Sequence, residues 1–272
     1  MSCYRKSEYQ KPIHIAEIDN LVVELYRTRE DMGRAAGKAV AGKMRELLSQ
    51  KELISMVFAA APSQNEFLNT LVREERIDWS RVIAFHLDEY IGLPKDASQR
   101  FSMWLDEHIY NIAKPGTIYY IGEGEGSPEE KCLRYSELLK DCHLDIACIG
   151  IGENGHIAFN DPPVADFNDP YLVKIVELDE TCRMQQVHDG CFPSLSDVPT
   201  QAATMTIPAI MSAAWMYCIV PGSSKGQAVK DTVEGEISTK CPASILRTHD
   251  HARLFLDPDS AAGLSFFAKK SR

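Results

Sequence analysis

Short apolar runs alternate with segments of helical periodicity along this chain, and this alternation limits the folds it can adopt more than any other feature. Four runs of strand length are almost continuously apolar, which is typical of strands buried on both faces of a sheet; they cover residues 53–60, 81–86, 144–151 and 215–220. Helical segments are predicted at residues 31–49, 63–75, 98–112, 128–139 and 223–233. Strand, helix and strand in repetition predict an α/β fold, in which a mainly parallel sheet carries helices on both faces.

Nothing in the 272 residues divides the chain, because it has no internal repeat, low-complexity tract or convincing linker. We therefore expect a single domain over residues 1–272. The first helix should begin near Thr28 or Asp31, either of which can cap a helix N-terminus. The sequence has no run of 18 apolar residues, and residues 1–10 are polar and charged, unlike a signal peptide. These features predict a cytoplasmic protein without a membrane partner.

The balance of charge narrows the classes of partner. Acidic residues number 39 against 29 Lys and Arg, for a formal net charge of −10, whereas nucleic-acid binders usually carry a basic excess. We therefore expect no nucleic-acid partner, although an acidic protein can still bind a small anion through local cations and backbone amides. The eight cysteines form no CxxC pair, which argues against a zinc ribbon or a thioredoxin-type site.

Ligands in open parallel sheets bind beyond the carboxyl ends of the strands, so the residues after each predicted strand are the candidates for a site. Asp88 and Glu89 follow the run at 81–86 and precede a turn that contains Gly92 and Pro94. A partly desolvated carboxylate has a raised pKa and can carry protons near neutral pH. The alternative is that these two carboxylates cap a turn or the next helix.

The segment after the run at 144–151 contains GIGENG (150–155), which matches the pattern GxGxxG. A dinucleotide site requires the third glycine to open a helix, but Pro162 and Pro163 close this segment, so we expect no nicotinamide cofactor. His156, with Asp161 five residues later, predicts a catalytic loop instead, since an imidazole oriented by a carboxylate is an acid and base near neutral pH. The alternative is a loop histidine whose ring is satisfied by its neighbours.

Two further strand ends offer groups for an anion. After 215–220, the sequence PGSSKGQA leads into a helix whose N-terminal amides, together with Lys225, suit a phosphate. A solvated lysine in the first helical turn is the alternative. After 53–60, Ser63 is expected to cap the next helix and Glu66 to complete a capping box, and Ser63 and Gln64 are candidates for binding an anion.

Taken together, these segments resemble the glucosamine-6-phosphate deaminase family, in the family's order and over most of the chain. The motifs that carry the resemblance are LDEYIGLP (87–94), GIGENGHIAFNDP (150–162), SKGQAVKDTVEG (224–235) and PASILRTH (242–249). The resemblance implies a Rossmann-like α/β domain that takes a hexosamine 6-phosphate and forms fructose 6-phosphate and ammonia. It implies no metal and no organic cofactor. The family includes monomers and hexamers, so a homo-oligomer is one expectation.

The resemblance also implies roles for individual residues. Asp88 would move a proton between C2 and C1 of the sugar through an enediol-type intermediate, and His156 would assist ring opening. Asp161 stands where the family has a glutamate that supports this histidine, and Asn154 completes the predicted catalytic set. Lys225 would hold the phosphate. The predicted substrate and phosphate contacts also include Ser63, Gln64, Gly155 and His188.

The chain departs from the family's pattern at three places. Asn154 stands where the family often has an aspartate, and His188 stands where a phosphate-binding arginine is expected. The loop AAAPSQNE (59–66) lacks the glycine usual in the family's phosphate loop. Two alternatives therefore stay open: a sugar-phosphate lactonase on the same fold, and a non-catalytic or differently specific sugar-phosphate binder. The lactonases carry a DER-type motif and a GxDGHTASLFP-type loop, whereas this chain has DEY and GENGHIAFNDP.

Overall fold

A computed structural model of the chain describes residues 11–268; residues 1–10, whose polar character bears on the signal-peptide prediction, lie outside the described residues. The main sheet has eight strands in the order β1-β2-β11-β10-β7-β3-β4-β6. All neighbours pair in parallel except β1 and β2, which are antiparallel. The strands are β1 (His14–Ile18), β2 (Leu21–Leu25), β3 (Ile54–Phe58), β4 (Val82–His86), β6 (Thr117–Ile118), β7 (Ile146–Ile149), β10 (Trp215–Val220) and β11 (Ala252–Leu256).

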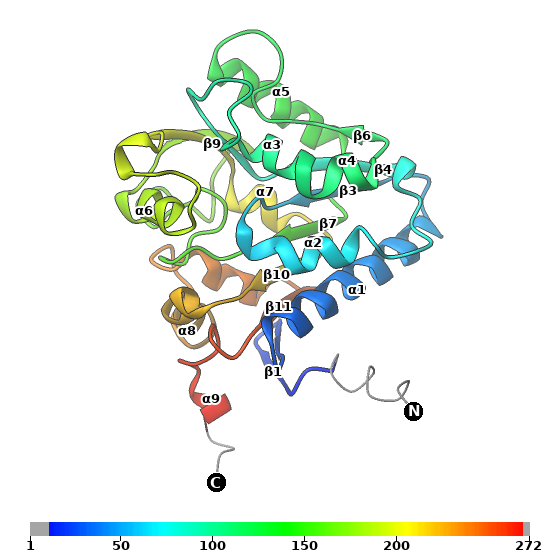
Figure 1. The fold of residues 1–272 in the computed structure, drawn as a ribbon, viewed down its shortest axis with the longest axis vertical. Coiled ribbons are helices and arrows are strands. Elements are labelled where there is room, and N and C mark those ends of the chain that lie inside the picture. Colours follow the sequence, from blue (N-terminus) through cyan, green and yellow to red (C-terminus); the bar gives the residue numbers. More distant parts are fainter. Residues whose placement is uncertain (1–10, 269–272) are drawn as a thin grey trace.

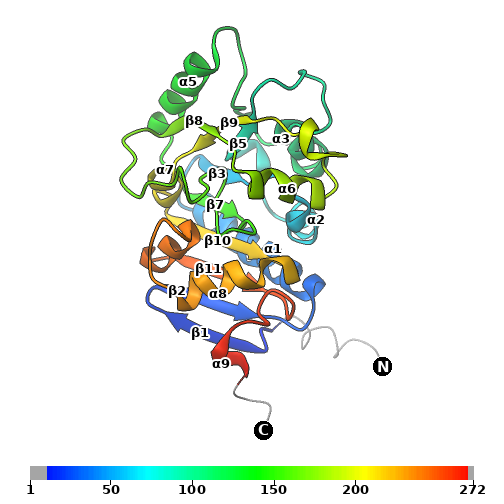
Figure 2. The same cartoon turned by 90° about the vertical axis from the view of Figure 1, so that its left-hand side faces the viewer.

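Helices cover both faces of this sheet, as predicted (Figures 1 and 2). Successive residues of one strand point to opposite faces, so Met56 packs in one hydrophobic core and Val57 in the other. The first core includes residues of α1 (Arg29–Leu48) and α2 (Asn65–Leu71), and the second includes residues of α5 (Pro128–Asp141), α7 (Ile207–Met211) and α8 (Gly226–Glu234). The remaining α-helices are α3 (Phe101–Leu105), α4 (Asn111–Ala113), α6 (Glu180–His188) and α9 (Ser265–Ala268), and a π-helical turn (Asp106–Tyr110) connects α3 to α4. The predicted fold class is confirmed.

A second, antiparallel sheet was not predicted. It consists of β5 (Asp88–Tyr90), β9 (Gln201–Met205) and β8 (Val173–Glu177), in that order. The chain leaves the main sheet after His86 and enters this small sheet at Asp88, whose backbone pairs with Thr204. The small sheet therefore holds Asp88 at the carboxyl edge of the large one.

Local predictions at the helix ends had mixed outcomes. The Thr28 hydroxyl accepts from the amide of Asp31 at 3.0 Å, so the first cap is confirmed as Thr28. The capping box at Ser63 and Glu66 was wrong, because residues Pro62–Gln64 form a 3-10 turn and neither side chain caps α2. Arg29 binds the Glu66 carboxylate instead, with 2.8 Å between Nε and Oε1.

The close approach of α1 to α2 depends on Gly33. A Cβ at this position would lie 2.4 Å from Cβ of Glu66, so only glycine lets the two helices meet here. This contact brings the first turn of α1, and with it Arg29, beside the loop at residues 62–64. In the part of the chain that the structure describes, no helix is both long and apolar enough to cross a membrane.

Candidate active site

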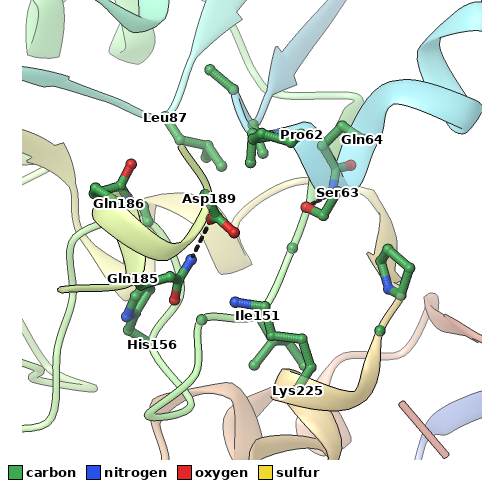
Figure 3. Close-up of a pocket in the computed structure, with 18 of the residues that line it drawn as sticks. Pro62, Ser63, Gln64, Leu87, Ile151, His156, Gln185, Gln186, Asp189 and Lys225 are labelled. Carbon is green, nitrogen blue, oxygen red and sulfur yellow. Dashed lines mark hydrogen bonds between the residues drawn. The ribbon is translucent and has the colours of Figure 1, made fainter. Parts of the chain in front are cut away.

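A cavity of about 190 Å³ opens at the carboxyl edge of the main sheet, where all four sequence segments singled out above converge. Five of the predicted site residues line it: Ser63, Gln64, Asp88, His156 and Lys225. Figure 3 shows Ser63 and Gln64 on one side, His156 on the other and Lys225 below. The segments follow neighbouring strands, β3, β4, β7 and β10, and parallel strands end at a common edge.

Asp88 is buried, with 7% of its surface exposed. Burial raises the pKa of its carboxyl group well above the usual range, and the nearby carboxylates of Glu89 and Asp161 raise it further. A carboxylate in this state binds a proton more strongly than an exposed one. Asp88 therefore has the property expected of a group that takes up and returns a proton near neutral pH.

Glu89 faces the other way and has a structural role. Its carboxylate accepts from the amides of Phe101 and Ser102, each at 3.1 Å, and from the Ser102 hydroxyl at 2.6 Å. Arg100 lies 3.3 Å from the same carboxylate. Glu89 therefore matches the alternative considered for this pair, in which a carboxylate caps the next helix. It holds the start of α3 beside the cavity wall at Phe101.

The His156 ring is held at Nδ1 by two acceptors. Oδ1 of Asn154 lies 2.7 Å away and Oδ1 of Asp161 lies 2.9 Å away. Because both neighbours are acceptors, Nδ1 carries the hydrogen, and Nε2 of the neutral ring is left with a lone pair. The ring rests against Gly152, where a Cβ would come within 2.1–2.4 Å of three ring atoms.

Asp161 is fully buried behind this histidine. Burial alone raises the pKa of its carboxyl group, but the hydrogen bond and charge of His156, with hydrogen bonds from Asn154 and the Cys182 thiol, hold the pKa below its ordinary value. The carboxylate is therefore kept ionised, which is the state that orients an imidazole.

Lys225 lies in the 3-10 turn Ser223–Lys225 that precedes α8, and only 6% of it is exposed. Among the described residues its ammonium group has no hydrogen-bond partner. Burial lowers its pKa, while Asp189 and Glu153 act in the opposite direction. Burying an ammonium group without an anionic partner costs free energy, so this position favours the binding of an anionic ligand.

Four of the predicted residues do not line the cavity: Asn154 and Asp161, whose side chains contact the His156 ring behind it, and His188 and Gly155, which make no such contact. His188 lies at the end of α6 with its side chain 57% exposed, and its Nδ1 is 3.5 Å from Glu153. Gly155 adopts φ +83°, and a Cβ there would lie 2.7 Å from Sγ of Cys241, so it serves the shape of the loop. Their predicted contacts with the substrate receive no support from these positions.

Residues that the sequence analysis did not select also line the cavity. Gln185, Gln186 and Asp189 form the wall contributed by α6 and the residue after it (Figure 3). Arg29 reaches the cavity from α1, and its Nη2 donates to the carbonyl of Pro62 at 3.0 Å. The sequence gives no sign of Arg29 beyond its place after a helix cap.

One group among residues 11–268 has the composition of a metal site: His156, Asp161 and Cys182, whose ligand atoms lie within 4.8 Å of one another. Nδ1 of His156 and Oδ1 of Asp161 already contact each other, so a cation between them would compete with this hydrogen bond.

Known proteins of one family resemble this chain in both sequence and structure. The model of the family described as glucosamine-6-phosphate isomerases/6-phosphogluconolactonase matches residues 27–255. Glucosamine-6-phosphate deaminase of Bacillus cereus (strain B4264) is 34% identical over 235 residues, covering 86% of each chain. Its counterpart in Exiguobacterium sibiricum is 35% identical over 199 residues, covering 73% of this chain and 77% of that protein.

Two solved structures illustrate the structural likeness. A monomeric glucosamine-6-phosphate deaminase superposes with a TM-score of 0.81 at 28% identity, covering 89% of this chain and 99% of the other. The 6-phosphogluconolactonase of Thermotoga maritima has a TM-score of 0.71 at 21% identity, covering 87% of this chain and 99% of the other. The second likeness concerns the fold alone.

Proposed function

This chain belongs to the family of glucosamine-6-phosphate isomerases and 6-phosphogluconolactonases, and we propose that within it the protein is a cytoplasmic deaminase that converts glucosamine 6-phosphate to fructose 6-phosphate and ammonia. The observation that carries this proposal is one cavity that combines a proton-binding carboxylate, an oriented histidine and an unpaired ammonium, contributed by Asp88, His156 and Lys225. The curated relatives of this name, 34–35% identical to the chain, support the same activity.

The substrate's phosphate binds Lys225, which gains the counter-ion that its burial demands. Ser63 and Gln64 line the same cavity and contribute to the binding of this anion. Arg29 adds a guanidinium group at the margin, held by Glu66 and the Pro62 carbonyl. This arrangement supplies positive charge in a chain that lacks the arginine expected at position 188.

His156 opens the sugar ring. Its Nε2 accepts the proton of the C1 hydroxyl, the bond between C1 and the ring oxygen breaks, and the ring oxygen takes up the proton. Asp161 and Asn154 stabilise the imidazole at Nδ1 throughout, so the same ring nitrogen can accept and deliver the proton.

Asp88 then acts on the open chain. Its carboxylate removes the proton from C2 while the C1 oxygen gains a proton, which gives an enolamine, and it then returns the C2 proton to C1. The amine loses the proton that balances the one gained by the C1 oxygen, so the C2–N single bond becomes an imine. Water adds to this imine, ammonia leaves, and a ketone remains at C2. The raised pKa of Asp88 suits this step because the carboxylate must hold the proton between removal and return.

Lactone hydrolysis on the same fold is the second candidate, and it is less favoured. Structural likeness to 6-phosphogluconolactonases is fold-level only, at 21% identity for the Thermotoga maritima protein. The motifs DEY (88–90) and GENGHIAFNDP (152–162) follow the deaminase pattern rather than that of the lactonases. A non-catalytic sugar-phosphate binder fits less well, because the His156–Asp161 pair and a buried Asp88 are all retained.

The deciding experiment measures ammonia and fructose 6-phosphate formed from glucosamine 6-phosphate by wild type, Asp88→Asn and Glu177→Gln. Glu177 is an exposed carboxylate on β8 of the same small sheet, and it provides the matched control. We expect equal release of both products by wild type and Glu177→Gln, and loss of both in Asp88→Asn by at least about 10³-fold. A wild type that is inactive toward glucosamine 6-phosphate but hydrolyses 6-phosphogluconolactone would show that the protein is a lactonase and not a deaminase. Activity retained in Asp88→Asn would remove Asp88 from the mechanism.

A further inference from the structure

Asp179 occupies the N-cap position of α6 but does not cap the helix. Its backbone is extended, as an N-cap requires, yet its side chain makes no hydrogen bond to the first-turn amides. The carboxylate turns instead toward the catalytic loop, where its Oδ2 accepts from Nδ2 of Asn154 at 3.5 Å. An aspartate at an N-cap usually accepts from the first-turn amides, so its contact with a residue distant in sequence requires an explanation.

The Asn154 side chain has only one orientation that satisfies its surroundings. Its Oδ1 accepts from the backbone amide of His156 at 3.1 Å and from the ring Nδ1 at 2.7 Å. Its Nδ2 donates to Asp161 at 2.9 Å and to Asp179 at 3.5 Å. A flipped amide would turn its oxygen toward two carboxylates and its NH₂ group toward two donors. The two carboxylates therefore determine which end of the amide meets the histidine.

We propose that Asp179 is a positioning residue, which acts through Asn154 to hold His156 with Nδ1 protonated and Nε2 free for the substrate. Asp161 and Asp179 together fix the Asn154 amide, and the amide oxygen in turn fixes the ring. This inference rests on the proposed function for its effect on the reaction rate, while the contacts themselves do not depend on it.

The proposal also explains why asparagine stands at a position where resembling enzymes often have aspartate. In Asn154→Asp, an oxygen would replace Nδ2 at 2.9 Å from Oδ1 of Asp161 and 3.5 Å from Oδ2 of Asp179. Like charges at these distances repel each other in a partly buried site. The substituted side chain must either rotate, which removes the acceptor from Nδ1, or take a proton on the oxygen that faces the two carboxylates, which keeps the acceptor but costs free energy. In this chain the negative charge lies at Asp179, and position 154 must be neutral.

A double-mutant cycle between Asn154→Asp and Asp179→Asn tests the proposal. In the double variant, an amide at position 179 faces a carboxylate at position 154, so the donor and acceptor are exchanged and the repulsion between these two positions is relieved, while that from Asp161 remains. We expect kcat to fall by about 100-fold in Asn154→Asp and by less than about tenfold in Asp179→Asn, with KM changed less than about threefold in both. The double variant should regain at least about tenfold in kcat over Asn154→Asp.

Glu177→Gln combined with Asn154→Asp provides the matched control. Glu177 is an exposed carboxylate two residues before Asp179 and bonds to Gln201, so its neutralisation should restore nothing. A double variant with Asp179→Asn that is no more active than Asn154→Asp, or an equal recovery with Glu177→Gln, would overturn the proposal.

Nitrogen-15 spectra of the imidazoles in substrate-free protein provide a readout that needs no activity. We expect the neutral His156 ring of wild type to be protonated at Nδ1, its signals to move in Asn154→Asp, and the wild-type pattern to return in the double variant with Asp179→Asn. If wild type releases no ammonia but this pattern holds, the proposed function fails and the positioning role stands. Unchanged ring signals across the cycle would reject the role whatever the activity.

Asp179→Ala keeps the test decisive if Asn154→Asp does not fold. Because the Asp179 carboxylate caps nothing, its removal should leave α6 intact while the Asn154 amide loses one anchor. We expect kcat to fall by about three- to tenfold with displaced His156 ring signals. Wild-type kcat and ring signals in this variant would contradict the proposal.

Discussion

Replacing Lys225 with methionine should weaken substrate binding while making the free protein more stable. The ammonium group is buried and has no hydrogen-bond partner among the described residues, so in the substrate-free protein only the nearby charges of Asp189 and Glu153 offset its desolvation. Methionine has a similar length and no charge, and its flexible side chain can fill the same space. Loss of an unpaired buried charge should raise the free energy of unfolding by about 1–3 kcal/mol. The unfolding midpoint should rise by about 2–10 °C.

The binding effect has the opposite sign. A hydrogen bond to a charged group contributes about 1.5–3 kcal/mol, so KM for glucosamine 6-phosphate should rise by about 10- to 150-fold in Lys225→Met. The catalytic groups Asp88 and His156 are contributed by other segments, so kcat should change less than KM.

The stability difference should also depend on pH with a defined sign. Burial lowers the pKa of Lys225 below its ordinary value, so between these two values the unfolded chain binds more protons than the native one. Wild type therefore gains stability as the pH rises through this alkaline window, and the advantage of Lys225→Met should be full at neutral pH and shrink above it.

Thermal unfolding at pH 7 and 10 together with steady-state kinetics would measure both effects. Lys230→Met is the matched control, because Lys230 is an exposed lysine on the same helix α8 and should alter neither quantity. A lower unfolding midpoint with an unchanged KM would show that Lys225 supports the fold and would refute this reasoning.

Three further predictions concern neighbouring groups. In Gly152→Ala, the added methyl group would displace the His156 ring, so we expect kcat to fall by at least about 100-fold and the free energy of unfolding to fall by about 1–3 kcal/mol. Wild-type kinetics in this variant would contradict the close packing of the ring against Gly152. Glu89→Gln removes a charge that raises the pKa of Asp88, so the acid limb of the profile of kcat/KM against pH should move to lower pH. The free energy of unfolding in denaturant should fall by about 1–3 kcal/mol, because the amides of Phe101 and Ser102 lose a charged acceptor. An acid limb at higher pH would contradict the expected direction of the pKa change. Arg29→Gln should raise both KM and the inhibition constant of inorganic phosphate by about three- to tenfold, with little change in kcat. The effect is moderate because this guanidinium group is partly exposed and also binds a carboxylate. A change in kcat alone would argue against a role in binding.

Much of the fold and the position of the site could be predicted from periodicity and order. The apolar runs at 53–60, 81–86, 144–151 and 215–220 became β3, β4, β7 and β10, with ends displaced by no more than two residues. Residues that follow these strands meet at one cavity because parallel strands end at a common edge. These outcomes depend on hydrophobic patterning and chain order, which are properties of the sequence itself.

The choice between adjacent carboxylates required the tertiary structure. Asp88 and Glu89 carry the same charge and differ by one position, so charge and spacing could not separate a proton carrier from a helix anchor, and only the resemblance to the family indicated Asp88. In β5 successive side chains point to opposite faces. The partner strand β9 decides which face meets the cavity, and that leaves Glu89 to the amides of α3.

Contacts between residues distant in sequence set the rest of the site. Arg29 binds Glu66 because Gly33 lets two helices approach closely, and this contact overrode the capping box expected at Ser63. Asn154 meets Asp179 only after the small sheet and α6 are in place. Local patterns determine which elements form and which strand ends can carry chemistry, whereas packing between distant segments determines which side chains meet there, since distances of a few ångströms between such segments are specified by the whole core.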